Sequence, residues 1–204
     1  MNRPGKIVCA GRNYVEHAKE LGNEVPSEPL IFLKPPTSVI GDGDTIVLPP
    51  LSARVEYEGE VGVIIGRRIR RASEFEAAAA IGALVALNDV TARDLQKRDG
   101  QWTRAKGFDT FCAIGAPAAP PKDLAPVTLI TRVNGQERQR ATVSDMVFGI
   151  PQLISFISQV MTLEPGDVIA TGTPAGVGQL TPGDRVEVEI VGLSRVSNPV
   201  AAEA

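Results

Sequence analysis

Three acidic residues, Glu56, Glu58 and Glu60, alternate along one short stretch of the chain. Successive side chains of an extended strand point to opposite faces, so these three share one face, while Val55, Tyr57 and other residues occupy the opposite face. Carboxylates about 7 Å apart on one face repel one another unless water or a cation lies between them. The pattern therefore indicates either a divalent-cation site or the solvent-facing side of an ordinary strand.

A further acid stands at the end of another apolar stretch. The apolar stretch that begins at residue 81 reads as a buried strand that ends at Asp89, and this position lets Asp89 join the acids of a neighbouring strand. Three carboxylates with open water positions suit a six-coordinate Mg²⁺ or Mn²⁺ ion. We therefore expect a hard-cation site that combines Asp89 with acids of the first stretch.

His17 and Glu20 form a candidate acid–base pair. Residues 13–21 predict a short helix with Asn13 as its cap. Side chains three positions apart are neighbours on a helix, so the carboxylate can hold one imidazole nitrogen and leave the other as a base. The alternative is a surface histidine beside a surface glutamate, and His17 is the only histidine of the chain.

Two other features suggest contacts with an acidic ligand. Lys34 ends an apolar strand at two prolines, where it is either a cation for that ligand or the polar end of a strand. Residues 171–178 contain three glycines, and their backbone N–H groups can receive a carboxylate, although a plain turn stays open. The glycine spacing matches neither a Walker loop nor the dinucleotide fingerprint, which argues against nucleotide binding.

Composition favours a small-molecule partner. The 204 residues, 43% hydrophobic and 22% charged, suit one core and a single domain. A net charge of −3 leaves no basic footprint for nucleic acid. The sequence has no apolar run of membrane-spanning length and no signal-peptide pattern at its start, so we expect a cytoplasmic protein without a membrane partner.

The elements that must position these residues are mostly strands. The remaining pattern predicts a hairpin at 127–139 around Asn134 and Gly135, a closing ribbon at 185–200, and helices at 73–80 and 151–162.

Several motifs together resemble the fumarylacetoacetate hydrolase family. They lie at residues 58–63, 88–94, 106–109 and 171–178, in the order and spacing typical of that family, and with 11–14 and 33–35 they span nearly the whole chain. The similarity is greatest to its short branch, which includes acylpyruvate hydrolases, oxaloacetate decarboxylases and isomerase/decarboxylases of homoprotocatechuate breakdown.

The resemblance implies a mixed α+β, mainly β fold, the family's β-sandwich roll with few peripheral helices. It also implies a homodimer and a single catalytic domain over 1–204. In that domain, segment 1–50 carries a lid helix at about 13–21, and 51–204 forms the β-roll core.

The resemblance further implies a set of site residues. Mg²⁺ or Mn²⁺ is expected on Glu58, Glu60 and Asp89, which leaves Glu56 outside the metal triad. His17, Glu20 and Lys106 are expected to be catalytic. Substrate contacts are expected from Arg12, Lys34, Gln96 and Thr173.

The implied chemistry is that of a metal-stabilised enolate of a 2-oxo acid, with Lys106 sharing the negative charge. For an acylpyruvate, His17 held by Glu20 activates water and the C–C bond is hydrolysed. For oxaloacetate, CO₂ leaves instead. For an unsaturated dioate of aromatic catabolism, such as 2-hydroxyhepta-2,4-diene-1,7-dioate or 5-carboxymethyl-2-hydroxymuconate, proton transfer gives isomerisation, with decarboxylation in some members. A non-catalytic metal-stabilised β-module would need neither the base nor the lysine.

Overall fold

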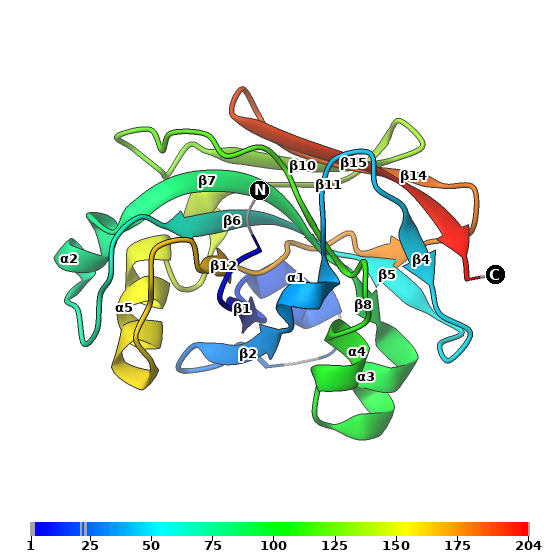
Figure 1. Cartoon of the computed structure of the whole chain (residues 1–204), viewed down its shortest axis with the longest axis horizontal. Helices are drawn as coiled ribbons and strands as arrows, with labels where there is room; N and C mark the ends of the chain where they lie inside the picture. The colour runs from blue at the N-terminus through cyan, green and yellow to red at the C-terminus, as the bar shows by residue number, and fades with distance from the viewer. Residues whose placement is uncertain (1–2, 21, 23, 204) are drawn as a thin grey trace.

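A seven-stranded sheet forms the centre of the computed structural model, which describes residues 3–20, 22 and 24–203 (Figure 1). Its strand order is β2-β1-β12-β6-β7-β9-β3. The strands are β1 Ile7–Gly11, β2 Leu30–Lys34, β3 Val39–Ile40, β6 Gly59–Ile65, β7 Ile81–Asp89, β9 Cys112–Ile114 and β12 Val168–Ala170.

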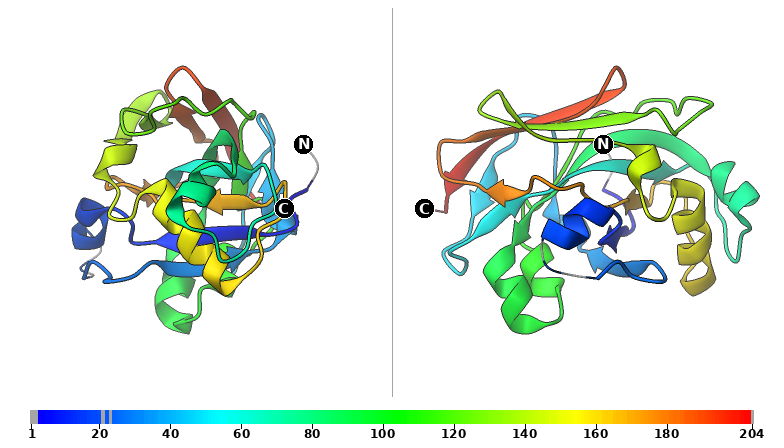
Figure 2. Two further views of the ribbon diagram at one scale, coloured as in Figure 1. Left: turned by 90° about the vertical axis from the view of Figure 1, so that its left-hand side faces the viewer. Right: turned by 180° about the vertical axis from the view of Figure 1, so that it is seen from behind.

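A five-stranded sheet, in the order β11-β10-β14-β15-β4, lies over β6 and β7 (Figures 1 and 2). The main apolar core joins the two sheets, because Val61 and Leu84 of the first pack in one cluster with Leu129 and Val188 of the second. A small third sheet has the order β13-β5-β8. These strands are β4 Ile46–Leu48, β5 Val55–Tyr57, β8 Thr91–Ala92, β10 Thr128–Val133, β11 Gln136–Thr142, β13 Gly178–Gln179, β14 Arg185–Ile190 and β15 Ser194–Ala202.

Short helices lie at the periphery of the sheets (Figure 1). They are α1 Val15–Glu20, α2 Glu74–Ala78, α3 Arg93–Asp99, α4 Thr103–Lys106 and α5 Ile150–Val160, with 3₁₀ turns η1 Pro36–Ser38 and η2 Val143–Asp145. Within the described part of the chain, no helix is long and apolar enough to cross a membrane. The expected fold class, mainly β with few peripheral helices, is confirmed.

The acidic stretch divides at Glu58 instead of continuing as one strand. β5 belongs to the small sheet and β6 to the large one, so the chain changes sheets between them. At this point side chains replace ladder partners: Glu58 donates its N–H to Asn88 Oδ1 at 2.9 Å, and Gly59 donates its N–H to Gln139 Oε1 at 3.0 Å. A side chain at Gly59 would collide with the hydroxyl of Thr131, so glycine is required here.

The expected lid helix is shorter than predicted. α1 begins at Val15 and ends at Glu20, and Leu21 lies outside the described residues. Asn13 is not its cap. Its side chain donates to the carbonyls of Phe148 (3.0 Å) and Thr171 (2.8 Å) and accepts the Phe148 N–H at 2.8 Å, because these buried backbone groups lack other partners.

Candidate active site

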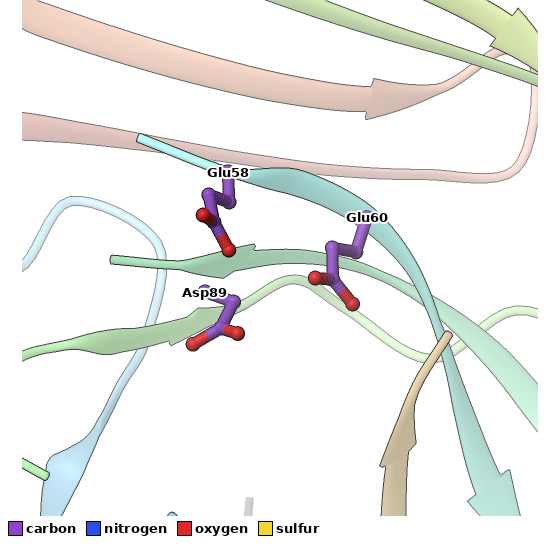
Figure 3. A group of neighbouring side chains, drawn as sticks. All are labelled: Glu58, Glu60 and Asp89. Carbon is purple, nitrogen blue, oxygen red and sulfur yellow. The ribbon is translucent and has the colours of Figure 1, made fainter. Parts of the chain in front are cut away.

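Three buried carboxylates meet where β6 begins and β7 ends. One oxygen each of Glu58, Glu60 and Asp89 lies within 4.8 Å of the others (Figure 3). The antiparallel β6–β7 register pairs Gly59 with Asn88, so Glu58 and Glu60, which flank Gly59, lie near Asp89, which follows Asn88. The sequence-predicted metal ligands are therefore brought together by strand pairing.

Buried cations surround two of these acids. Lys106 Nζ donates to Glu58 Oε2 and to Asp89 Oδ2, each at 2.6 Å, and Arg93 also donates to Glu58. Burial opposes ionisation of Glu58, but the charges of Lys106 and Arg93 outweigh it and hold the pKa of Glu58 far below its usual range. Burial likewise opposes the charge of Lys106, but Asp89 and Glu58 raise its pKa above the ordinary lysine value. Lys106 is therefore a fixed ammonium group.

Glu60 lacks such compensation. Among the described residues, no lysine or arginine nitrogen lies within ion-pairing distance of it, and its Oε2 accepts one hydrogen bond, from Gly172 N–H at 2.8 Å. Burial, followed by the charges of Asp89 and Glu58, raises the pKa of Glu60 well above its ordinary value. A hard cation relieves this repulsion, so the closely spaced oxygen donors fit Mg²⁺ or Mn²⁺.

Lys34 lies behind the triad and borders only a second, more open cavity, not the one beside the triad. Its fully buried Nζ donates to Asp89 Oδ1 at 2.5 Å and to the Val90 carbonyl at 3.1 Å. Both oxygens of Asp89 thus contact a lysine. This placement suits a residue that orients Asp89, and it gives no support to the expected substrate contact of Lys34.

Arg93 is a site residue that the sequence reasoning missed. Its guanidinium donates to Glu58, to Glu56 at 2.7 Å and to Gln96 Oε1 at 2.6 Å. Because Arg93 donates to the oxygen of Gln96, the Gln96 amide is oriented with its NH₂ group left to donate to a ligand. Glu56 also accepts a hydrogen bond from Arg54, so its carboxylate forms ion pairs with two arginines and stays outside the triad. The i,i+3 spacing of Arg93 and Gln96 was the available signal.

A cavity of about 350 Å³ opens beside the triad. Of the sequence-predicted site residues, Lys34 and Glu20 do not border it. Arg12 reaches it from a left-handed backbone position with φ 57°, uncommon outside glycine. The predicted site residues that do border it are Arg12, His17, Glu58, Glu60, Asp89, Gln96, Lys106 and Thr173.

The expected contact between His17 and Glu20 is present. His17 Nδ1 lies 3.1 Å from Glu20 Oε2, which leaves Nε2 as the ring nitrogen available for proton transfer. The His17 side chain is buried, whereas that of Glu20 is 33% exposed. Glu20 therefore stands behind His17 and orients it.

The glycine-rich loop between β12 and β13 receives the protein's own carboxylates. Gly172 N–H donates to Glu60, and Gly176 N–H donates to Glu20 at 3.0 Å. The Thr173 hydroxyl donates to the Gly59 carbonyl and accepts from Gln139, each at 2.8 Å. These N–H groups thus hold two site acids in place of the ligand carboxylate that the sequence suggested.

Two aromatic side chains, Phe32 and Trp102, form part of the cavity wall. Phe32 and Trp102 meet edge to face, with ring centroids 5.1 Å apart. Lys106 Nζ lies 5.0 Å from the centroid of Phe32, a cation–π distance. Both rings also border a second, more open cavity of about 1000 Å³.

Comparisons with known proteins agree on one family. The family model described as fumarylacetoacetate (FAA) hydrolase C-terminal matches residues 6–201. A mitochondrial oxaloacetate tautomerase of Arabidopsis thaliana is 47% identical over 94% of this chain and 88% of its own. A mitochondrial oxaloacetate decarboxylase of Dictyostelium discoideum is 44% identical over 92% of this chain and 89% of its own.

A solved structure supports the same relationship. The crystal structure of 5-carboxymethyl-2-hydroxymuconate delta-isomerase from Mycobacterium smegmatis superposes with a TM-score of 0.92. It is 44% identical, and the match covers 99% of this chain and 80% of that one. The similarity thus extends to fold as well as sequence.

Proposed function

Because the chain belongs to the fumarylacetoacetate hydrolase family, we propose that it is a divalent-metal-dependent enzyme that converts small 2-oxo acids through an enolate. One observation carries the proposal: the buried triad, the ammonium group of Lys106 and the His17 imidazole all border one cavity of about 350 Å³. That volume suits a small acid.

Glu58, Glu60 and Asp89 would hold Mg²⁺ or Mn²⁺, which when bound acts as a Lewis acid on an oxygen of the substrate. Lys106 stabilises the negative charge that develops on the enolate oxygen, because its ammonium group is fixed before the reaction begins. Arg12 and Gln96 border the same cavity and supply N–H donors for a substrate carboxylate.

We propose hydrolysis of acylpyruvates as the net reaction. His17, oriented by Glu20, accepts a proton from water at Nε2. The resulting hydroxide attacks the distal carbonyl, the C–C bond breaks, and a carboxylic acid and the enolate of pyruvate are released. The position of His17 on the same cavity as the triad supports this role.

Other reactions of the same enolate are second candidates. Relatives named oxaloacetate tautomerase and oxaloacetate decarboxylase favour turnover of oxaloacetate, which needs no hydrolytic water. The structural neighbour named as a delta-isomerase favours isomerisation of an unsaturated dioate of aromatic catabolism. In each, Lys106 keeps its role as charge stabiliser.

The test uses chelator-treated protein with Mg²⁺ or Mn²⁺ added back. We expect metal-dependent loss of the enol absorbance of acetylpyruvate, with acetate and pyruvate as products, and abolition of that reaction by His17→Ala. Turnover of oxaloacetate alone, or of the dioate alone, would replace hydrolysis by the corresponding second candidate. Full turnover in chelator would overturn the metal-dependent proposal.

We also propose that the chain acts as a single catalytic domain in the cytoplasm and assembles as a homodimer. For a chain of 21.6 kDa, light scattering should give twice that mass. A monomer that is fully active would contradict this part of the proposal.

A further inference from the structure

A chain of hydrogen bonds connects Tyr57 to the acid–base pair. The Tyr57 hydroxyl donates to the Gly176 carbonyl at 2.8 Å, and the Gly176 N–H donates to Glu20 Oε1 at 3.0 Å. The other oxygen of Glu20 lies 3.1 Å from His17 Nδ1. In the view from behind, α1 lies beside the segment that follows β12 (Figure 2).

Glu20 depends on these contacts because little else holds it. α1 has only six residues, which is too short for stability on its own. The Glu20 side chain is 33% exposed, so water competes for its carboxylate. The Gly176 N–H is the contact that holds Glu20 from the side away from His17.

The Gly176 peptide, in turn, has little freedom to move. Its φ of +99° favours glycine, and an added Cβ would lie 2.1 Å from the Arg138 carbonyl oxygen. Backbone packing therefore limits the position of this peptide, and Tyr57 fixes its orientation through the carbonyl. The carbonyl and the N–H of Gly176 belong to two consecutive peptide groups that share its Cα, so a restrained carbonyl, together with the packed φ of Gly176, limits the motion of the N–H that donates to Glu20.

Tyr57 is the last residue of β5 and directly precedes Glu58. Its backbone pairs with Gly178 of β13, so it contacts the glycine loop at two points. One side chain thus connects the strand that directly precedes Glu58 to the glycine loop whose Gly176 N–H donates to Glu20.

We propose that Tyr57 is a positioning residue: through Gly176 it holds Glu20, and thereby His17, at a fixed place relative to the triad. The inference rests on the proposed hydrolysis and deepens it. The proposed role of Tyr57 affects hydrolysis and decarboxylation differently. Hydrolysis needs His17 and Glu20 to activate water, whereas decarboxylation of oxaloacetate requires only the triad, its metal and Lys106.

The test is Tyr57→Phe, which removes the hydroxyl and keeps the ring. We expect kcat for acetylpyruvate hydrolysis to fall about fivefold or more, the effect of one lost hydrogen bond. Magnesium affinity and oxaloacetate turnover should change less than about twofold. In a Glu20→Gln background, Tyr57→Phe should add almost nothing, because the two residues act in one chain.

Tyr14→Phe is the matched control. Tyr14 is the other of the two tyrosines, it is also buried, and its hydroxyl has no hydrogen-bond partner among the described residues. Its substitution should leave the ratio of hydrolysis to decarboxylation unchanged. Equal loss of both reactions in Tyr57→Phe would indicate general damage and would overturn the proposal.

A second readout does not depend on activity. His17 is the only histidine, so its imidazole ¹⁵N resonances identify its tautomer without assignment. We expect the Nδ1–H tautomer to dominate in the starting protein and a mixture of tautomers in Tyr57→Phe. An unchanged tautomer would overturn the positioning role, whereas a protein inert toward acetylpyruvate but with this tautomer shift would overturn the proposed hydrolysis alone.

Discussion

Lys106 occupies the carboxylate oxygens that a metal ion would need. Its ammonium group bridges Glu58 and Asp89, so an incoming cation must displace these contacts. We expect Lys106→Met to bind Mg²⁺ more tightly, on the order of tenfold, because a nearby positive charge is removed. Turnover should fall about a hundredfold or more, because the charge stabiliser is lost.

Calorimetric titration with Mg²⁺ beside steady-state turnover tests both effects of Lys106→Met. Lys97→Met is the control, since Lys97 borders the same cavity but makes no ion pair within the described residues. It should change metal affinity less than about twofold. Weaker metal binding by Lys106→Met than by the starting protein would contradict the competition.

Glu60 makes metal binding depend on pH. A metal binds the ionised carboxylate, whereas burial and the neighbouring acids favour the protonated form and raise the pKa of Glu60 above its ordinary 4.5. Magnesium affinity should therefore rise with pH, up to about tenfold per unit, until the raised pKa is passed, and then level off. Titrations from pH 5.5 to 8 check this; Glu60→Gln should remove most of the slope, and a flat profile in the starting protein would refute it.

The individual site residues were predictable to unequal degrees. Spacing and motif order predicted a triad that the structure brings together, and the i,i+3 spacing predicted the His17–Glu20 contact. For Arg93 the i,i+3 spacing to Gln96 was the only local signal, because its bonds to Glu56 and Glu58 connect residues 37 and 35 positions apart. Those distant partners also explain why Glu56, although it alternates with the ligands, stays outside the triad.

At the scale of elements, α1 is held at both ends by one loop. Asn13 donates to the Thr171 carbonyl, and Gly176 N–H donates to Glu20. We expect Asn13→Ala to destabilise the fold by about 2–3 kcal/mol, because the buried Phe148 N–H and carbonyl lose their partner. Hydrogen exchange in 15–20 should accelerate at the same time.

Exchange measured by mass spectrometry tests the effect of Asn13→Ala on α1. Lys19→Ala is the control, because its pair with Glu16 in the same helix is exposed and contributes little. If both variants exchange alike in this segment, Asn13 does not anchor the helix.

The wall of Phe32 and Trp102 divides two cavities. Trp102 packs so closely on Gly11 that a Cβ there would lie 2.8 Å from the indole. Trp102→Ala should join the two spaces and raise kcat/KM for long-chain acylpyruvates over acetylpyruvate, on the order of tenfold. Phe108→Ala is the control, because Phe108 borders only the outer cavity, and an equal change of preference in both variants would count against the wall.

Caps and turns could be predicted from the sequence, because the residues that form them lie only a few positions apart. The helix expected at 73–80 is present as α2 and begins at a capping box of Ser73 and Glu76, and the hairpin turn at Asn134 and Gly135 lies where the sequence placed it. The change of sheet at Glu58 was missed, because the acceptors that interrupt the ladder come from Asn88 and Gln139. Asn13 was assigned as a cap for the same reason, since its true partners lie more than a hundred residues away.

At the scale of the whole molecule, pairings between distant segments assemble the site. β1 pairs in parallel with β12, which joins residues 7–9 to 168–170 and places the glycine loop beside α1. Strand periodicity carries no information about such pairings. The expected fold class therefore came from the resemblance in motif order, which reflects the complete arrangement of the chain.

Metal binding should stabilise the whole fold without being needed to form it. The core between the two sheets is built from apolar side chains, so chelator-treated protein should stay folded, with an unchanged far-ultraviolet circular dichroism spectrum. Magnesium at a hundred times its Kd adds about 2.7 kcal/mol to the free energy of unfolding, a rise in Tm of about 5–11 °C for a chain of this size.

This stabilisation should be larger at pH 8 than at pH 5.5. In the metal-free protein, protonated Glu60 contributes stability that is present at low pH and is lost as pH rises from its ordinary 4.5 through its raised folded pKa, because the ionised form repels Asp89 and Glu58. Bound metal removes that repulsion. Melting curves at both pH values, with Glu60→Gln as control, measure the difference. If the protein unfolds on chelation alone, the metal has a structural role and the protein is a metal-stabilised module. The proposed enzyme should instead stay folded without metal, because the apolar core between its two sheets does not include the triad.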